Sequence, residues 1–256
     1  TDDHTLVINL VEPMADFLKI LLNHSFLPVH PPTIEKHGGP GRRMSGWTNP
    51  ETYVGNGPFQ LNEWKPDSYI EVIPNPHYWD ADVVQLDAIR FYPISDENTE
   101  IRAFESGQLH ITNTVPVNKR TWYRDNTPEK IRFDPYAGVY FYRINMTRPA
   151  LKNPAVRQAL SLAIDRGKIV DNLLNGGERI AYAMVPEGIA EYQPPRISEY
   201  DPDRARQYLK EAGFPQGQNF PKIEILYNTS DNHRKIAEAI QHMWRNELGI
   251  DATLTN

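Results

Sequence analysis

Residues 222–256 read KIEILYNTSDNHRKIAEAIQHMWRNELGIDATLTN, and this stretch decides the fold class of the chain. The segment 222–228 is typical of a buried strand, and 250–256 is typical of a second strand. Between them, 231–248 carries apolar residues at helical spacing, among them Ile236 and Ile240. A strand, a helix and a second strand in this order predict two parallel strands joined by a crossover helix, which is the unit of an α/β fold.

Three polar residues, Asn228, Thr229 and Ser230, connect the first strand to the helix. In open α/β sheets ligands bind at this place, because unpaired helix N–H groups and polar side chains meet outside the carboxyl ends of strands. His233 lies at the end of the buried face of the helix, since Ile236 follows it at helical spacing. The structural alternative is an Asx turn at Asn228, an N-cap at Ser230 and a half-buried histidine.

The composition is that of a globular protein with room for a real core: 256 residues, 39% hydrophobic and 23% charged. A net charge of −6 without any Lys/Arg run argues against nucleic acid or a membrane surface as partner. The apolar stretch 17–22 is interrupted by Lys19 and is too short to span a bilayer. The absence of Cys excludes disulfides, thiolate zinc sites and cysteine nucleophiles within the chain.

Further patterns predict additional elements along the chain. Strands are expected at 4–11, 59–64, 69–73, 88–94, 109–112 and on both sides of Asp134-Pro135, with a Pro- and Gly-rich loop at 28–50. Helices are expected at 14–23, after an N-cap at Ser95, around 119–124, after caps at Asn153 and Asp165, and at 201–214. Because the first and last predicted strands lie at the chain ends, we expect an internal fragment of a longer protein, incomplete at both ends.

The sequence holds no recognisable catalytic motif. Its eight histidines form no HExxH pair, and neither a GxSxG elbow nor a P-loop occurs. We therefore expect a protein that is not an enzyme and that needs no metal or cofactor. The 13 tyrosines fit a recognition surface and a Tyr-rich core equally well.

Several segments together resemble one family. GNGPFQLNEW, NPHYWD, RAFESGQLHIT, VYFYRINMTRPALKNPAVRQALSLAIDRGKIV, YDPDRARQYLKEAGF and ILYNTSDNHRKIAEAIQHMWRNELGIDATL occur in this order. They are similar to the family 5 (cluster C) extracytoplasmic peptide-binding proteins of ABC importers, most of all to the oligopeptide and murein-peptide branch. The resemblance implies α/β lobes of the periplasmic-binding-protein type II with mixed sheets. It also implies a three-domain parent: 1–29 ends the second domain, 30–137 is the central segment of domain I, and 138–256 is the first half of domain III.

The resemblance also implies a ligand site. A receptor for varied peptides pairs with the ligand backbone and fixes its charged ends. The positions that match ligand-contacting residues of the family are Asn113, Tyr136, Phe141, Arg143, Asn228 and His233. Packing at a strand corner, in the core or against solvent is the alternative for Tyr136, Phe141 and Arg143. Related oligopeptide receptors have Tyr where this chain has Phe141 and an acidic residue where it has Arg143, which implies a shift in preference toward acidic peptides.

The function implied by the resemblance is capture of peptides between two lobes and delivery to the permease subunits of an ABC importer. We expect a monomer in the periplasm, or a cell-surface lipoprotein where the source lacks an outer membrane. Two alternatives stay open: a receptor for a non-peptide solute such as an oligosaccharide or a metal chelate, and a hydrolase. Saturable peptide binding without turnover distinguishes a peptide receptor from a receptor for another solute and from a hydrolase.

Overall fold

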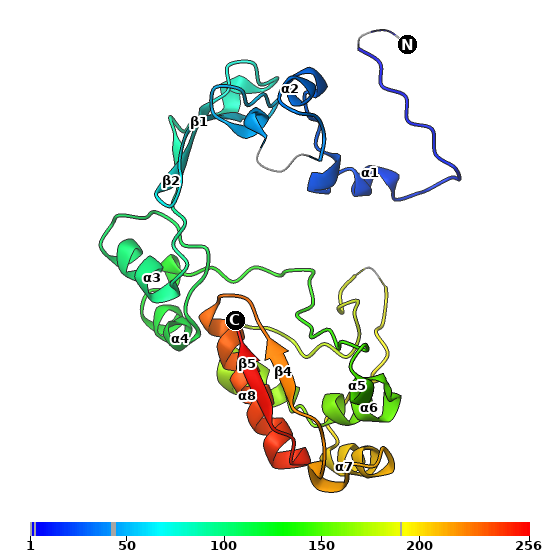
Figure 1. The fold of residues 1–256 in the computed structure, drawn as a ribbon. Helices are drawn as coiled ribbons and strands as arrows, with labels where there is room; N and C mark the ends of the chain where they lie inside the picture. The colour runs from blue at the N-terminus through cyan, green and yellow to red at the C-terminus, as the bar shows by residue number, and fades with distance from the viewer. Residues whose placement is uncertain (1, 3, 42–44, 190) are drawn as a thin grey trace. The chain divides into compact units, whose positions relative to one another are not determined.

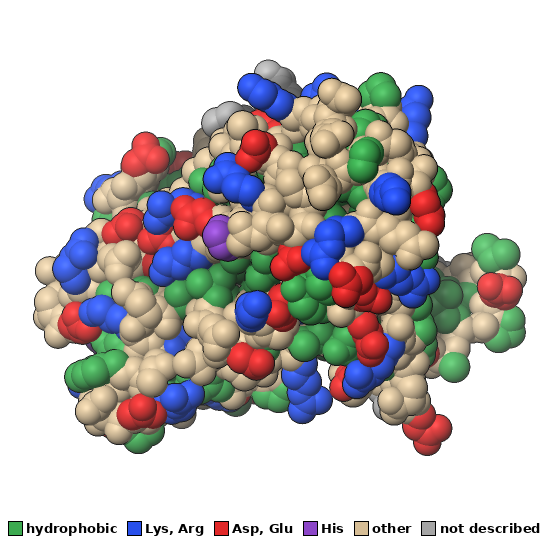
Figure 2. All heavy atoms as spheres, turned by 90° about the horizontal axis from the view of Figure 1, so that it is seen from below, with side chains coloured by type: hydrophobic (Ala, Val, Ile, Leu, Met, Phe, Trp, Pro, Cys, Tyr) green, Lys and Arg blue, Asp and Glu red, His purple; other side chains and the backbone are tan. Residues whose placement is uncertain are grey.

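The computed structural model describes residues 2, 4–41, 45–189 and 191–256. The chain divides into two compact units, Thr1–Pro93 and Ile94–Asn256 (Figure 1). None of the helices that the structure describes is long and apolar enough to cross a membrane. On the face shown in Figure 2, Lys and Arg side chains are interspersed with Asp and Glu, so this face carries no patch of a single sign.

The first unit combines short helices with a three-stranded antiparallel sheet. Its elements are α1 (Phe17–Ile20), η1 (His24–Phe26), α2 (Pro31–Lys36), η2 (Gly46–Thr48), β1 (Phe59–Lys65), β2 (Tyr69–Pro74), η3 (Ala81–Val83) and β3 (Ile89–Phe91). The strands follow the order β1-β2-β3. The β1–β2 turn has Pro66 in its first central position and Asp67 at φ 59°, a left-handed conformation that Asp tolerates. The predicted hairpin is thereby confirmed.

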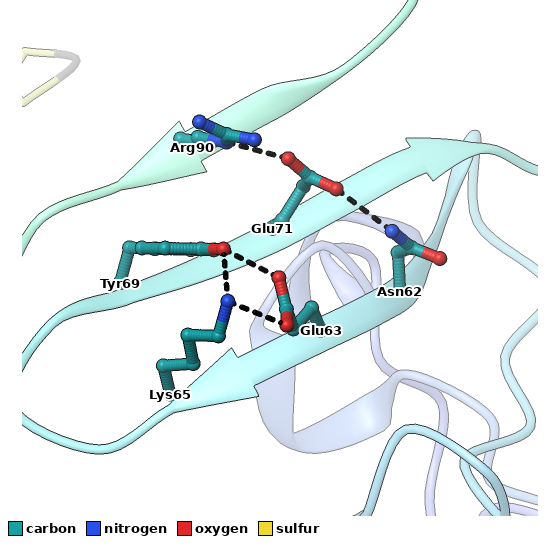
Figure 3. Close-up of polar contacts among 6 residues, drawn as sticks. All are labelled: Asn62, Glu63, Lys65, Tyr69, Glu71 and Arg90. Atoms are coloured by element: carbon teal, nitrogen blue, oxygen red, sulfur yellow. Dashed lines mark hydrogen bonds and ion pairs between the residues drawn. The ribbon is translucent and has the colours of Figure 1, made fainter.

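One face of this sheet carries a row of polar contacts (Figure 3). On it, Tyr69 donates to Glu63 Oε2 over 2.5 Å and accepts from Lys65 Nζ over 2.8 Å. On the same strand, Glu71 accepts from Arg90 Nε over 2.5 Å and from Asn62 over 2.7 Å. These contacts tie all three strands together through cross-strand neighbours, which is the usual way that an exposed sheet face is stabilised.

The second unit begins with two helices and continues with helices around a two-stranded sheet. Its elements are α3 (Glu97–Glu105), α4 (Val117–Asn126), η4 (Pro128–Lys130), α5 (Pro149–Lys152), α6 (Pro154–Leu162), η5 (Lys168–Leu174), α7 (Pro202–Glu211), η6 (Pro215–Gly217), β4 (Ile223–Leu226), α8 (Asp231–Leu248) and β5 (Ala252–Thr255). Strands β4 and β5 are parallel, with Ile223 opposite Ala252. The strand–helix–strand prediction for 222–256 is therefore confirmed.

Two buried clusters hold this unit together. One joins α6, α7 and the end of α8 through residues such as Val156, Leu209 and Leu248. The other joins η5, the sheet and the middle of α8 through residues such as Ile225 and Ile240. Helix α8 therefore contributes to both clusters, because its apolar residues recur at helical spacing over five turns.

The predicted caps are mostly confirmed, and the local chemistry explains where helices begin. Asn153 accepts from the N–H of Ala155 over 2.9 Å at the start of α6. Asp165 accepts from the N–H of Lys168 over 3.1 Å, and the helix predicted after it forms as a π-helix, η5. The predicted cap at Ser95 is wrong by one residue, since Asp96 accepts from the N–H of Thr99 and begins α3.

Several predicted strands are wrong. None forms at 4–11, at 109–112 or on either side of Asp134-Pro135 within the described residues. The strand predicted at 88–94 does form, as β3, although its Arg90 and Phe91 are exposed where a buried strand was expected. A strand exists only where its backbone groups pair with a neighbour, and alternation along a sequence does not supply that partner. The predicted loop 28–50 contains α2 and η2, and its residues 42–44 lie outside the described part.

Candidate ligand site

The turn between β4 and α8 presents the polar residues expected from the sequence. Ser230 is the N-cap of α8: its backbone is extended (φ −165°, ψ 130°), and its Oγ accepts from the N–H of His233 over 3.4 Å. Thr229 donates to the Asn256 side chain over 3.1 Å, which fixes the turn against the segment after β5. The capping alternative is thus confirmed for Ser230, and it leaves Asn228 and His233 available for other contacts.

Asn228 and His233 contact one another. The amide oxygen of Asn228 lies 2.5 Å from Nδ1 of His233. An amide oxygen only accepts, so Nδ1 carries the hydrogen in this contact. The neutral ring then presents Nε2 as an acceptor, and the protonated ring presents it as a second donor. Asn228 therefore fixes the orientation of the ring and the chemistry of the nitrogen that faces away from it.

An aromatic residue that the sequence analysis missed completes this arrangement. The Tyr140 ring stacks on the His233 ring, with centroids 4.7 Å apart and an angle of 28° between the planes. Tyr140 also makes an edge contact with Tyr142, whose ring packs against the second buried cluster. Burial raises the pKa of Tyr142, with a further contribution from its hydrogen bond with Tyr140. The alternation of Tyr140 and Tyr142, opposite in phase to Phe141 and Arg143, is the sequence signal that could have identified these two rings.

Phe141 and Arg143 lie together on the opposite side of this segment. Phe141 is 44% exposed, and the Arg143 guanidinium carbon lies 5.7 Å from the centroid of its ring. The core alternative for Phe141 is therefore wrong. Arg143 forms no ion pair with any described residue. A cation held over an aromatic face, without a carboxylate partner in the chain, is an arrangement that can bind an anionic group.

Asn113 and Tyr136 are not joined to these residues by any contact among the described residues. The Tyr136 side chain is 90% exposed, and the N–H of Gly138 donates to its carbonyl over 2.9 Å. The backbone N–H of Asn113 donates to Glu100 of α3 over 2.7 Å, so its own side chain remains exposed. The structure thus brings Asn228 and His233 into contact, and Phe141 and Arg143 into contact, but leaves these two apart from both pairs.

A shallow hollow lies beside the turn, at the start of α3 and α8. Its lining is Ser95, Asp96, Tyr227, Thr229, Ser230, Asp231, Arg234 and Asn256. The lining includes two residues of the polar turn but neither Asn228 nor His233. Helix α3 also reaches the turn through Glu97, which contacts Ser230 over 3.4 Å. Nothing in the sequence indicated this contact, because an acidic residue in the first helical turn is favourable there without any tertiary partner.

Comparison with known proteins identifies the family. The family of bacterial extracellular solute-binding proteins, family 5, matches residues 1–256. The periplasmic oligopeptide-binding protein OppA of Salmonella typhimurium is 34% identical over 262 residues, which cover all of this chain and 47% of that protein. This chain thus spans about half the length of the curated relatives that it matches.

Solved structures show the same fold. The murein tripeptide-binding protein MppA of Escherichia coli superposes with a TM-score of 0.89 at 32% identity, over 96% of this chain and 48% of that one. OppA of Haemophilus influenzae in complex with the peptide RPPGFSPFR gives a TM-score of 0.86 at 28% identity, over 96% and 48%. The predicted class, α/β lobes of the periplasmic-binding-protein type II, is confirmed. Since its family is matched along the whole chain, the chain belongs to the bacterial extracellular solute-binding proteins of family 5.

Proposed function

We propose that this chain is part of the ligand-capture subunit of an ABC importer, a receptor that binds peptides and delivers them to a membrane permease. The observation that carries the proposal is the match of the whole chain to relatives named as oligopeptide- or murein-peptide-binding proteins. We further propose that the receptor acts outside the cytoplasm as a monomer, in the periplasm or as a surface lipoprotein, and binds without turnover.

The same proposal assigns the chain to three domains of a longer protein. Residues 1–29 then end the second domain, 30–137 form the central part of domain I, and 138–256 form the first half of domain III. Ligand is bound where two lobes close on one another, as in other hinged binding proteins. Under this assignment, the turn at Asn228 and the segment around Phe141 both belong to domain III.

The geometry supports a proposed role toward a peptide for His233 and for Arg143. His233, oriented by Asn228 and stacked on Tyr140, offers one nitrogen to a ligand group. Nε2 accepts from a peptide N–H when neutral and donates to a carboxylate when protonated. The free N–H groups at the start of α8 add a weak attraction for anions, about 0.3–1 kcal/mol at an exposed site. Arg143 over Phe141 offers a charge to an acidic side chain.

Asn113 and Tyr136 remain proposed ligand contacts on the strength of the resemblance alone. Exposed tyrosine offers rigid apolar area with a polar tip, and an exposed amide offers both a donor and an acceptor, so both suit a peptide backbone. Both residues are exposed in this chain, Tyr136 at 90%.

The test uses the full-length protein, stripped of ligand by unfolding and refolding. Ligands that co-purify are first identified by mass spectrometry, and peptides of two to six residues are then titrated by calorimetry. We expect saturable binding of peptides with no cleavage on prolonged incubation. Binding of an oligosaccharide or a metal chelate in place of peptides, or turnover of a chromogenic ester or glycoside, contradicts the proposal.

Variants at the site connect binding to the geometry. His233→Ala should weaken peptide binding by about tenfold, because the variant loses one hydrogen bond to the ligand and the stack with Tyr140. Asn228→Ala should have a smaller effect, since the ring loses its orientation but keeps both nitrogens. The control is His242→Ala, which alters an exposed histidine on the same helix, hydrogen-bonded to the Asn246 side chain. Equal affinities for wild type and His233→Ala across all peptide lengths would show that His233 is only a helix residue.

A further inference from the structure

The N-terminal turn of α8 is tied to the N-terminal turn of α3 by two side-chain contacts. Ser230 Oγ donates to Glu97 Oε1 over 3.4 Å, and Asn98 Nδ2 donates to Asp231 Oδ2 over 3.4 Å. Each contact joins residues 133 positions apart in the chain. Ser230 is also the cap that holds the N–H of His233. We call residues 228–233 the ligand turn. Glu97 lies outside this turn, on α3, but contacts Ser230, the residue that shapes it.

Glu97 is an unusual residue to find at this position. Its side chain is 7% exposed, and its Oε2 has no hydrogen-bond partner among the residues that the structure describes. Glu97 also forms no ion pair with any residue that the structure describes. A buried carboxylate without a cation and with one oxygen unbonded is costly, whereas the neutral acid is far less so.

The charged groups around Glu97 come from two helices. From α8, Asp231 repels a negative charge on Glu97, and Lys235 favours one. From α4, Arg120 also favours one, but its guanidinium donates to Glu178 over 2.8 Å and to the Leu174 carbonyl over 3.0 Å. Burial, followed by the charge of Asp231, raises the pKa of Glu97 above its usual range.

The start of α8 holds a second buried acceptor without a donor. Asn232, in the same turn of α8, has an Oδ1 that is buried without a hydrogen-bond partner among the described residues. A protonated carboxyl keeps Oε1 as acceptor for Ser230 and adds one O–H donor to this region. An ionised carboxyl adds only a further acceptor and a charge beside Asp231. The contact between the two helices thus suits the neutral acid.

We propose that Glu97 is a positioning residue for the ligand turn: its protonated carboxyl holds α3 against the start of α8, and its ionisation loosens that contact. The ligand role of the turn rests on the proposed function, but the coupling between α3 and α8 does not. Glu97 binds its proton more tightly while α3 and α8 are in contact than after the two helices separate. The contact is therefore fully formed at low pH and weakens as pH rises through the range in which Glu97 ionises.

The test measures how often the start of α8 opens when its contact with α3 loosens, in the full-length protein and without ligand. Amide hydrogen exchange of residues 231–236 is measured by mass spectrometry from pH 4.5 to pH 8 and corrected for intrinsic exchange rates. We expect protection in the wild type to fall as pH rises, by up to about tenfold per pH unit, because one proton is linked to the opening. Glu97→Gln, which stays neutral and keeps a donor, should be protected at every pH. Glu97→Ala should be unprotected at every pH.

Glu129→Gln, in the exposed η4 turn, is the matched control and should follow the wild type. A wild-type pH profile retained in Glu97→Gln, or full protection in Glu97→Ala, overturns the proposal. Peptide affinity measured over the same pH range separates this inference from the proposed function. If exchange behaves as expected but no peptide binds, the coupling stands and the function falls. If peptides bind but protection does not change with pH, the function stands and the coupling falls.

Discussion

The indole N–H of Trp244 donates to the carbonyl oxygen of Leu160 over 2.8 Å, which links α8 to α6 across 84 positions of the chain. Leu160 lies in the last turn of α6, where carbonyl groups have no partner within the helix. The Trp244 ring packs against both buried clusters of the second unit. One side chain therefore satisfies a helix end and joins the two parts of the core, and it fixes α8, the helix that Ser230 caps.

Replacing this indole by a phenyl ring tests the link. We expect Trp244→Phe to lower the free energy of unfolding by about 1–2 kcal/mol, because the buried Leu160 carbonyl loses its donor while most of the packing is kept. Thermal and urea unfolding of the full-length protein measure the change. Trp122→Phe is the control, since that ring is 54% exposed, and its stability should stay within about 0.5 kcal/mol of wild type. If Trp244→Phe also stays within about 0.5 kcal/mol of wild type, the hydrogen bond makes no net contribution to the free energy of unfolding.

The end of α8 depends on a glycine. Gly249 is the C-cap residue at φ 66°, and a Cβ there would collide with the carbonyl oxygen of Gln216. Gly213 has a positive φ as well, 92°, but a Cβ there would meet open space. We expect Gly213→Ala to cost about 1 kcal/mol from backbone strain alone, and Gly249→Ala to cost more because the backbone must also move. Chemical denaturation of both variants makes the comparison, and equal losses would show that the close approach is relieved without cost.

The sequence predicted the elements whose signals are local. The cap at Asn153 and the crossover from β4 through α8 to β5 were correct, because helix starts and hydrophobic periodicity are set by neighbouring residues. The strands predicted around Asp134 were wrong, because pairing depends on a partner that alternation does not reveal. In the same way, Asn228 and His233 lie five residues apart and were identifiable. Tyr140, which stacks on His233, and Glu97, which contacts Ser230, lie far away in the sequence, and only the fold brings them to the turn.

A tyrosine in α4 predicts how stability changes in alkaline solution. The Tyr123 hydroxyl donates to Glu105 over 2.8 Å, and the side chain is buried. Burial, with the Glu105 hydrogen bond, raises the pKa of Tyr123 from 10.0 to about 12. Since the folded state holds the proton more tightly, this contribution is complete below pH 10 and is lost as pH rises from 10 to about 12.

Tyr123→Phe should therefore be about 1 kcal/mol less stable at neutral pH and lose less stability than wild type between pH 10 and 12. Urea unfolding at a series of pH values gives both quantities, and other alkaline groups cancel in the difference. Tyr192→Phe, at a 43% exposed tyrosine, should leave the wild-type profile unchanged. Parallel pH profiles for wild type and Tyr123→Phe would contradict the raised pKa.

The last prediction concerns which peptides are preferred. Arg143 lies over Phe141 and has no carboxylate partner among the described residues, so its charge is available to a ligand. We expect peptides with one Asp or Glu to bind more tightly than their Asn or Gln counterparts in the full-length protein. Arg143→Gln should reduce that preference by about 1 kcal/mol, roughly fivefold in affinity, while neutral peptides bind as before. Arg143→Lys should retain part of it, because the charge remains but the planar stack on Phe141 is lost. Calorimetric titration of matched peptide pairs at low and high salt measures each effect, since a charge contact at an exposed site weakens as salt is added. An equal loss for acidic and neutral peptides would instead assign Arg143 a structural role on this strand-like segment.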